Sequence, residues 1–169
     1  MKFRLISRVL GIGLIAFSFL QLTPIIVSII YNEDNMAAFA YSFLITLTFG
    51  SFLYLVNFEK KYEGIRVKEG FLLTVLLWLF FTIFATLPLI FGTKSGLSIV
   101  SAYFEASSGL TTTGATIFSD LSGEYYSILF YRGLLQWIGG LGIIVLAIAL
   151  MPLLGLAVCS YIGEKLKAQ

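Results

Sequence analysis

The sequence contains no histidine and a single cysteine, Cys159. Without histidine, the chain has no imidazole to act as an acid, a base or a metal ligand. One cysteine can form neither a disulfide within the chain nor a zinc-binding cysteine cluster. The threonines could in principle act as nucleophiles, but no basic partner lies near them in sequence. We therefore expect a protein that is not an enzyme.

Charge is also scarce. Eleven Lys and Arg and nine Asp and Glu make up 12% of the 169 residues, against a usual value of about 25%. Hydrophobic residues make up 59%, and the mean hydropathy is +0.96. A soluble domain of this size buries only about 70% of its surface and could not hide so many apolar side chains. The composition predicts an all-α integral membrane protein surrounded by lipid. The net charge of +2 is too small to indicate a nucleic-acid partner.

Four apolar runs are long enough to cross a membrane, which takes about 20 residues. They occupy residues 5–31, 36–56, 70–91 and 126–151. The first run is longer than the apolar core of a signal peptide and has no small-residue cleavage site, so we expect it to be retained. Pro24 should kink this first helix, because proline has no backbone N–H to donate.

The positions of the basic residues predict the orientation in the membrane. Three of the eleven lie at the N-terminal end, four in the charged segment 57–69 and two near the C-terminal end. With four spans, all nine fall on one side, which we expect to be cytoplasmic together with both termini. The remaining two are Lys94, in a loop on the other side, and Arg132, inside the last apolar run.

Residues 97–118 fit neither a span nor an ordinary loop. Ser98 is a candidate N-cap for a short helix that runs to about Ser108, and Gly109 is expected to end it. Both flanking spans have their outer ends on the same side, so the segment must enter and leave there. We predict a re-entrant pore helix followed by a return strand, Thr-Thr-Thr-Gly-Ala-Thr, at 111–116. An interfacial helix with a surface loop is the alternative.

A return strand of this composition suits a cation filter. Non-helical backbone inside a membrane is tolerated where protein buries it or where it lines water. Its carbonyl oxygens can then replace the water molecules around an ion. Gly114 can adopt a positive φ without steric penalty, which lets neighbouring carbonyls align. The short helix would point its partly negative C-terminal end toward the ion.

Two charged residues fall inside the predicted membrane region, Glu105 and Arg132. An intramembrane charge is costly and is normally paired. The favoured interpretation is a structural ion pair that braces the pore helix against the last span. The alternative places Glu105 at the filter mouth, where it would attract cations. A charge swap, Glu105→Arg with Arg132→Glu, is expected to restore folding if the pair is structural.

Three glycines lie in the middle of the last span: Gly139, Gly140 and Gly142. Glycines at this spacing let helices approach closely, and they can also ease bending. Close packing is the simpler interpretation, and a gating hinge is the alternative.

The longest motifs resemble those of a known family. Residues 102–118 (AYFEASSGLTTTGATIF) look like the first pore loop of the Trk/Ktr/HKT superfamily of potassium transporters, most of all its bacterial TrkH-type subunits. Residues 129–147 (LFYRGLLQWIGGLGIIVLA) are similar to the helix that follows this loop in the family. The likeness extends over nearly the whole chain.

This resemblance implies a potassium-channel-like span–pore–span repeat, of which the family has four around one ion path. The implied organisation is an N-terminal two-helix hairpin (1–56), a cytoplasmic loop (57–69), one repeat (70–151) and a tail or the start of the next repeat (152–169). The resemblance assigns a potassium filter to the return strand. Its implied residues are Thr111, Thr112, Thr113, Gly114 and Ala115.

The expected function is potassium transport across a bacterial inner membrane, with K⁺ as the transported, filter-bound ion. One pore loop cannot close a filter that needs four. The chain is therefore expected either to assemble as a homo-oligomer or to lack further repeats of a longer polypeptide. The resemblance also implies a cytosolic nucleotide-binding regulatory subunit as partner. The alternative is a truncated or regulatory membrane subunit that conducts nothing.

Overall fold

The computed structural model describes residues 3–56 and 67–144. These residues are helical apart from turns and loops, and no strand occurs among them. The helices are α1 (Phe3–Leu20), α2 (Thr23–Ile30), α3 (Met36–Val56), α4 (Val67–Gly92), α5 (Ile99–Leu110) and a last helix, Tyr126–Ile144. Four units are long and apolar enough to cross a membrane. The first is α1 and α2 taken as one span, and the others are α3, α4 and the last helix. The predicted all-α membrane fold is confirmed.

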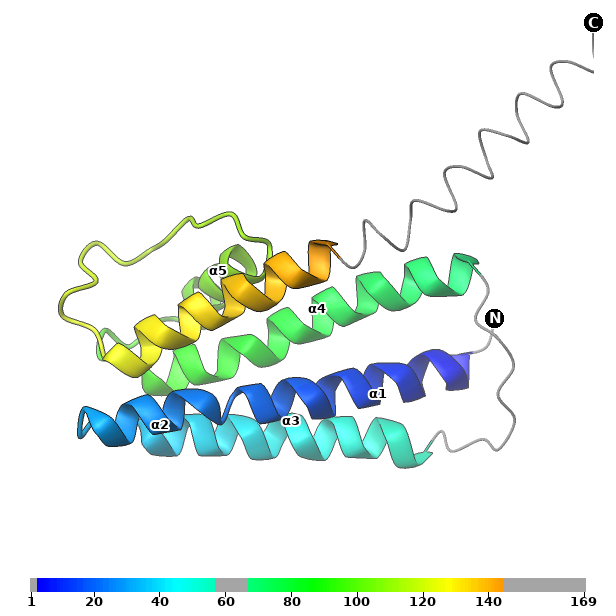
Figure 1. Ribbon diagram of the computed structural model, residues 1–169, viewed down its shortest axis with the longest axis horizontal. Coiled ribbons are helices and arrows are strands. Elements are labelled where there is room, and N and C mark those ends of the chain that lie inside the picture. The colour runs from blue at the N-terminus through cyan, green and yellow to red at the C-terminus, as the bar shows by residue number, and fades with distance from the viewer. Residues whose placement is uncertain (1–2, 57–66, 145–169) are drawn as a thin grey trace, which may run out of the picture.

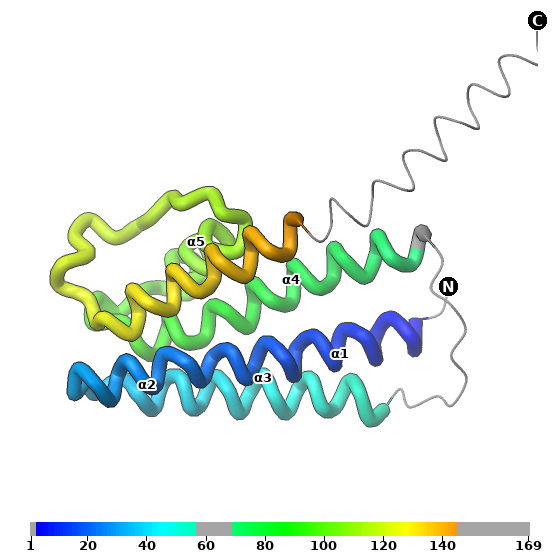
Figure 2. Tube along the Cα trace, viewed as in Figure 1, coloured from blue at the N-terminus to red at the C-terminus, as the bar shows by residue number. Residues whose placement is uncertain are grey.

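The long helices lie side by side in an elongated bundle (Figure 1). α1 and α2 run along α3 as a hairpin, α4 packs against both α1 and α3, and α5 packs against α4. The last helix lies beside α4 on the far side from the hairpin. The turn after α2, the end of α4 and the start of the last helix all lie at one end of the bundle, so residues 93–125 leave that end and return to it (Figure 2).

The predicted kink in the first apolar run is a break between two helices. α1 ends at Leu20, two residues turn, and α2 begins at Thr23 with Pro24 in its first turn. Pro24 cannot donate to the carbonyl oxygen of Leu20, four residues earlier. The hydroxyl of Thr23 donates to that oxygen instead, at 2.8 Å. The chain continues in nearly the same direction, so α1 and α2 together still form one 28-residue span.

A second proline, Pro88, lies inside α4 and frees another carbonyl oxygen. The oxygen of Phe84 accepts a hydrogen bond from the buried side-chain amide of Gln21, at 3.1 Å. The hydroxyl of Tyr131, in the last helix, donates to the next carbonyl oxygen, that of Ala85, also at 3.1 Å. Side chains from the hairpin and from the last helix therefore donate hydrogen bonds to the carbonyl oxygens near Pro88. These bonds join the hairpin and the last helix to α4.

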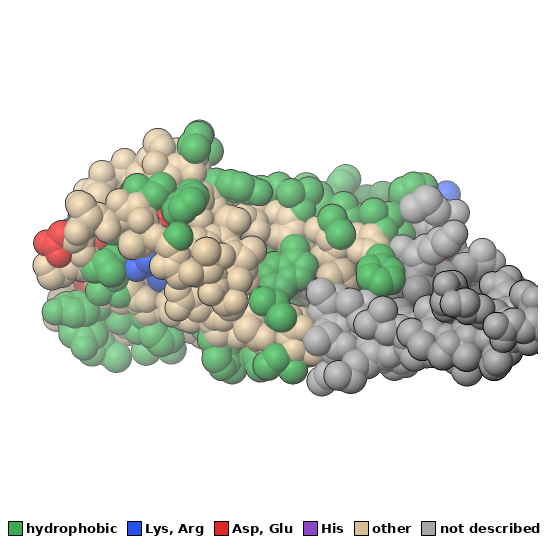
Figure 3. Space-filling model, turned by 90° about the horizontal axis from the view of Figure 1, so that it is seen from above, with side chains coloured by type: hydrophobic (Ala, Val, Ile, Leu, Met, Phe, Trp, Pro, Cys, Tyr) green, Lys and Arg blue, Asp and Glu red, His purple; other side chains and the backbone are tan. Residues whose placement is uncertain are grey.

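Small residues set the spacing of the hairpin. A Cβ added to Gly11 would lie 2.7 Å from the carbonyl oxygen of Gly50, so the backbones of α1 and α3 are in contact there. This close approach is typical of helices that pack in membranes. The outward faces are apolar, with Phe52 61% and Val75 63% exposed. Figure 3 shows hydrophobic side chains along the sides of the body and charged ones gathered at the end that holds the turns.

The predicted boundaries of the spans are close to the observed ones. α3 has the predicted bounds, while α4 begins at Val67, inside the segment 57–69 predicted to be a loop. The remainder of that loop (57–66), the end of the predicted last span (145–151), the tail (152–169) and Cys159 lie outside the described residues.

Candidate functional site: the end of α5 and its return segment

α5 begins as predicted. The hydroxyl oxygen of Ser98 accepts a hydrogen bond from the backbone N–H of Ser101, at 3.2 Å, and the helix starts at Ile99. One face of α5 is buried, including Ala102, Glu105 and Ala106, whereas the opposite face is open, with Val100 80% exposed. The helix is therefore covered on one side only by the described part of the chain.

The C-terminal end of α5 lies against the middle of the last helix. A Cβ added to Gly139 would lie 2.1 Å from the carbonyl oxygen of Leu110, so only glycine fits at this position. Gly139 lies thirteen residues after Tyr126, the first residue of the last helix, or about 20 Å along a helix rising 1.5 Å per residue. The end of α5 is thus far from the end of the bundle at which residues 93–125 enter and leave.

The prediction that Gly109 ends α5 is wrong. The helix continues to Leu110, and a Cβ on Gly109 would lie 3.1 Å from the Cβ of Leu135. Gly109 therefore serves close packing rather than chain reversal. The reversal comes at Thr112, whose φ is +58°.

Hydrogen bonds at the end of α5 form a Schellman motif. The N–H of Thr112 donates to the carbonyl oxygen of Gly109, and that of Thr113 donates to the carbonyl oxygen of Ser108, both at 3.0 Å. In this motif a residue in the left-handed conformation turns the chain out of the helix, and glycine usually takes that position. Here the position is taken by a threonine.

The sign of φ alternates over the next residues. Gly114 has a φ of +74°, as its predicted role requires, and Thr113 between the two left-handed residues keeps a negative φ. These positive φ values depart from the extended conformation that a strand would have. No heavy atom lies within 4 Å of a Cβ built on Gly114, so this backbone is open.

Three carbonyl oxygens in this stretch have no donor. Among the described residues, none donates a hydrogen bond to the carbonyl oxygens of 112–114, and these residues are exposed. The carbonyls on either side are engaged. The oxygen of Thr111 accepts from the hydroxyl of Thr112 at 2.7 Å, and that of Ala115 accepts from the hydroxyl of Ser108 at 2.6 Å. The backbone around Gly114 can therefore offer three partly negative oxygens to a cation.

The structure brings Glu105 and Arg132 together. Arg132 Nη2 lies 3.3 Å from Glu105 Oε1, and Glu105 is 2% exposed. The same oxygen accepts hydrogen bonds from the hydroxyl of Thr116 and, at 3.3 Å, from the N–H of Ile117. The guanidinium of Arg132 also lies over the ring of Phe118, 5.3 Å from its centre. The pair therefore fixes the far end of the return segment as well as bracing α5.

Ser108 and Thr116, whose hydroxyl groups hold the far end of the return segment against α5, were not singled out in the sequence. Both are short hydroxyl residues in a stretch rich in Ser and Thr, where composition alone does not distinguish them. The sequence feature that could have pointed to them is their closeness to residues 112–114. A hydroxyl on one side of the chain reversal can donate to a group on the other side.

The remaining predicted glycines face neighbouring side chains. A Cβ on Gly142 would lie 3.3 Å from the Trp78 ring, and one on Gly140 would lie 3.9 Å from the methyl carbon of Thr112. Gly139 and Gly142 thus serve close packing, and Gly140 leaves an ordinary contact distance to the return segment. A gating hinge at these glycines stays a prediction.

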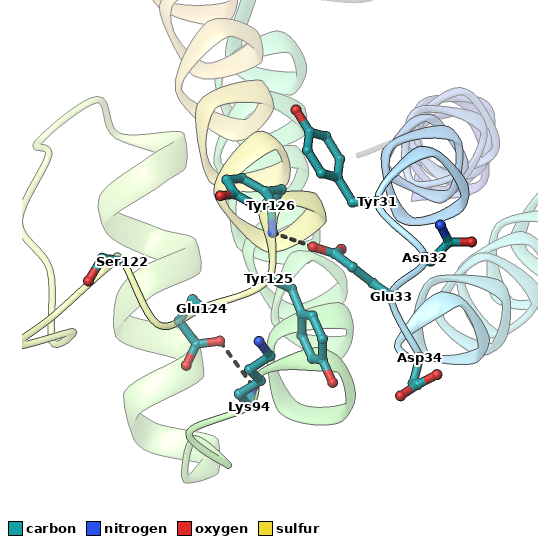
Figure 4. Close-up of a pocket in the computed structure, with 9 residues that line it drawn as sticks. All are labelled: Tyr31, Asn32, Glu33, Asp34, Lys94, Ser122, Glu124, Tyr125 and Tyr126. Atoms are coloured by element: carbon teal, nitrogen blue, oxygen red, sulfur yellow. Dashed lines mark hydrogen bonds between the residues drawn. The ribbon is translucent and has the colours of Figure 1, made fainter.

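A polar cavity of about 360 Å³ opens at the end of the bundle (Figure 4). Two of its three carboxylates, those of Glu33 and Glu124, accept hydrogen bonds from backbone N–H groups. Glu33 accepts from the N–H groups of Tyr126 (2.6 Å) and Ser127 (3.1 Å), and Glu124 accepts from those of Lys94 and Ser95. These contacts tie three loops together. Over the described residues, no group of three or more Asp, Glu or Cys side chains could hold a metal ion.

Comparison with known proteins decides the family. Residues 35–167 match the TrkH family, which is described as a cation transport protein. The chain belongs to the TrkH family. The Trk system potassium uptake protein TrkH of Escherichia coli K12 is 44% identical over 155 residues, and TrkG of the same strain is 36% identical over 153. These matches cover 92% and 90% of this TrkH-family chain and 32% and 31% of the relatives.

A solved structure supports the same assignment. The potassium transporter TrkH from Vibrio parahaemolyticus matches with a TM-score of 0.85 and 39% sequence identity. The match covers 92% of this TrkH-family chain and 33% of the solved one. The chain thus spans about a third of the length of the relatives that it matches.

Proposed function

We propose that this chain contributes one pore loop to a potassium transport pathway in a bacterial inner membrane. The observation that carries the proposal is the open stretch of backbone at residues 112–114, whose three carbonyl oxygens have no donor within the described chain. Backbone carbonyls replace the hydration shell of K⁺ in selectivity filters. The relatives are named potassium uptake proteins, which agrees with this cargo.

The proposed placement in the membrane makes residues 93–125 re-entrant. α4 and the last helix would span the bilayer, and both would meet its outer surface at the end where these residues enter and leave. The tip of α5 lies about 20 Å along the last helix, which corresponds to the middle of a bilayer that is about 40–45 Å thick with its headgroup regions included. In this placement the open carbonyls lie at mid-membrane depth, and both termini and the segment 57–69 face the cytoplasm.

The proposed filter has fewer ion-coordinating residues than the range Thr111–Ala115 that the sequence predicts. The carbonyl oxygens of Thr111 and Ala115 already accept hydroxyl protons. We assign ion coordination to the carbonyl oxygens of Thr112, Thr113 and Gly114, and structural roles to the two flanking residues. Glu105 and Arg132 position the return segment and do not contact the ion.

One pore loop does not enclose an ion. We propose that the pathway is completed by three further span–pore–span repeats, supplied by more of the same polypeptide or by other copies of the chain. The span–pore–span unit is residues 70–151, preceded by the hairpin 1–56 and the loop 57–69. A cytosolic nucleotide-binding subunit would dock on the cytoplasmic face that holds this loop and the segment 152–169.

A non-conducting regulatory membrane subunit is the second candidate. The observation that favours it is that the described residues hold one short helix with a single return segment, α5 and residues 111–116, which cannot enclose an ion without further repeats. A host bacterium that lacks potassium uptake, and therefore grows only at high K⁺, separates the two functions. Expression of this chain alone tests a homo-oligomer. Expression of a complete four-repeat polypeptide that begins with this sequence tests the longer chain.

Growth at low K⁺ with either form supports the proposed function, and native mass spectrometry in detergent then gives the number of copies. If both forms reach the membrane and neither restores growth, the transport proposal is wrong and the regulatory function is supported.

A further inference from the structure

Two helices of this chain end in the same hydrogen-bond motif. At the end of α2, the N–H of Asn32 donates to the carbonyl oxygen of Ile29 (3.3 Å), and that of Glu33 donates to the carbonyl oxygen of Ser28 (2.9 Å). This is the Schellman pattern that ends α5, with Asn32 in the left-handed position (φ +51°) instead of Thr112 (φ +58°). The two turns therefore differ mainly in the side chain at this position.

That side chain makes a physical difference. Asparagine adopts the left-handed conformation several-fold more often than other non-glycine residues, whereas a β-branched residue there is a genuine outlier. Steric strain of this kind persists only where the surroundings fix the conformation. At Thr112 the backbone does so, because the N–H of Thr112 is bonded to the carbonyl oxygen of Gly109 and the N–H of Thr113 to that of Ser108.

Glycine would remove the strain but would also free the backbone. Glycine populates positive and negative φ about equally, so it would let the peptide group between residues 112 and 113 rotate. A β-branched residue has far fewer accessible conformations. Once the Schellman bonds hold it left-handed, its side chain limits rotation of the first carbonyl of the open stretch, and the methyl group faces Gly140 without a clash.

We infer that Thr112 is a positioning residue for ion selectivity: its β-branched side chain, held in a strained left-handed conformation, fixes the direction of the carbonyl oxygens that face the ion. This inference rests on the proposed function. It assigns the selectivity role to the shape of the side chain at a helix end and not to a contact between that side chain and the ion.

The test uses the complete transporter in which the transport proposal holds. Three variants are compared: Thr112→Gly frees the backbone, Thr112→Val keeps the branched shape without the hydroxyl, and Asn32→Gly makes the matched change at the other Schellman motif. The readouts are ⁸⁶Rb⁺ uptake with competition by K⁺ and by Na⁺, and the denaturation temperature of the purified protein.

The expected result is a roughly tenfold lower preference for K⁺ over Na⁺ in Thr112→Gly, because glycine leaves the backbone free to rotate and the carbonyl oxygens lose their fixed direction. Its denaturation temperature should be unchanged or higher. Thr112→Val and Asn32→Gly should keep the wild-type preference.

Three results would overturn the inference. They are a folded Thr112→Gly protein with the wild-type preference, a Thr112→Val protein that loses preference as Thr112→Gly does, and an equal loss in Asn32→Gly. A wild-type protein that takes up no Rb⁺ and is not stabilised by K⁺ contradicts the proposed function, and with it this inference. Normal wild-type uptake with any of the three results contradicts this inference alone.

Discussion

Of the two Schellman turns of this chain, one is tied to neighbouring helices by its side chains (the closed turn), and the other is followed by three carbonyl oxygens without a donor among the described residues (the open turn). After α2, the hydroxyl of Ser28 lies 3.2 Å from the carbonyl oxygen of Glu33, and the Glu33 carboxylate binds the first N–H groups of the last helix. Asn35 then donates to the carbonyl oxygen of Gly92 and to the hydroxyl of Ser127. After α5, no residue in the described ranges 3–56 and 67–144 donates to the carbonyl oxygens of 112–114.

The difference lies in which backbone groups have partners. Away from water, backbone polar groups are nearly always paired, because an unpaired one carries a desolvation penalty. The side chains of the turn after α2 join the hairpin to α4 and the last helix. In the turn after α5, the bonded carbonyl oxygens of Thr111 and Ala115 flank three that accept no hydrogen bond from the described residues. In the proposed function these three oxygens coordinate the ion.

The largest effect is expected where the open turn touches the last helix. Gly139→Ala places a Cβ 2.1 Å from the carbonyl oxygen of Leu110, and a clash with backbone exceeds the usual overpacking penalty of about 1–3 kcal/mol. We expect loss of folded protein, measured as the monodisperse fraction in detergent. Gly140→Ala is the matched control, because its Cβ would meet only the Thr112 methyl at 3.9 Å. Equal yields for the two variants would contradict the observed packing of α5.

Next in size is the loss of the anchor of the open turn. Glu105→Gln keeps an oxygen for Thr116 and the N–H of Ile117 but removes the charge beside Arg132. Breaking a buried pair costs about 3–5 kcal/mol, and the 16% exposure of the Arg132 side chain places this one toward the lower value. The denaturation temperature should fall in Glu105→Gln and fall further in Glu105→Ala.

The charge swap is a sharper form of the same test. Arginine has no hydrogen-bond acceptor, so arginine at position 105 leaves Thr116 and Ile117 without a partner. We now expect Glu105→Arg with Arg132→Glu to fail to restore the wild-type denaturation temperature. Full restoration would reduce the role of Glu105 to the ion pair alone.

A smaller effect is expected at Pro88, where a side chain donates to the carbonyl oxygen that the proline leaves without a backbone donor. Gln21→Leu leaves the oxygen of Phe84 without its donor, at a cost of about 1–3 kcal/mol. Pro88→Ala restores a backbone N–H that can reach the same oxygen, so Gln21→Leu should cost less in that background. A double-mutant cycle on the denaturation temperature measures this coupling, and additive effects would contradict it.

The smallest effect is expected at the closed turn. Glu33→Ala removes the acceptor for the N–H groups of Tyr126 and Ser127, and losing such a cap costs about 0.5–2 kcal/mol. Asp34→Ala is the control, because Asp34 is exposed and points away from Glu33 (Figure 4). We expect a lower denaturation temperature for the first variant only, with potassium selectivity unchanged in both. Altered selectivity in Glu33→Ala would place the closed turn in the ion path.

The sequence predicts the spans of this chain well because the signals are long and local. Runs of about 20 apolar residues and the Ser98 cap are visible without tertiary contacts. The end of α5 was less predictable: Gly109 is the obvious helix terminator, yet Leu135 packs against it and the turn falls on a threonine. That position depends on a contact between two helices.

The partners of the return segment were unpredictable for a similar reason. Thr116 and Ser108 are separated by several residues from the groups that they bind, and many other hydroxyl side chains surround them in sequence. The roles of Gln21 and Tyr131 likewise follow from Pro88, which lies 67 and 43 residues away from them along the chain. Only the fold brings these side chains to the carbonyls that the proline frees.

The most direct test of the central claim compares two glycines in the complete transporter. Gly114 and Gly96 both have a positive φ, +74° and +62°, and neither has a heavy atom within 4 Å of an added Cβ. Alanine at either position therefore introduces similar strain, but only Gly114→Ala disturbs the open carbonyls. We predict a loss of ⁸⁶Rb⁺ uptake of about tenfold or more in Gly114→Ala, with near-normal uptake in Gly96→Ala and similar denaturation temperatures. Normal uptake in a folded Gly114→Ala protein would contradict the assignment of ion coordination to this segment.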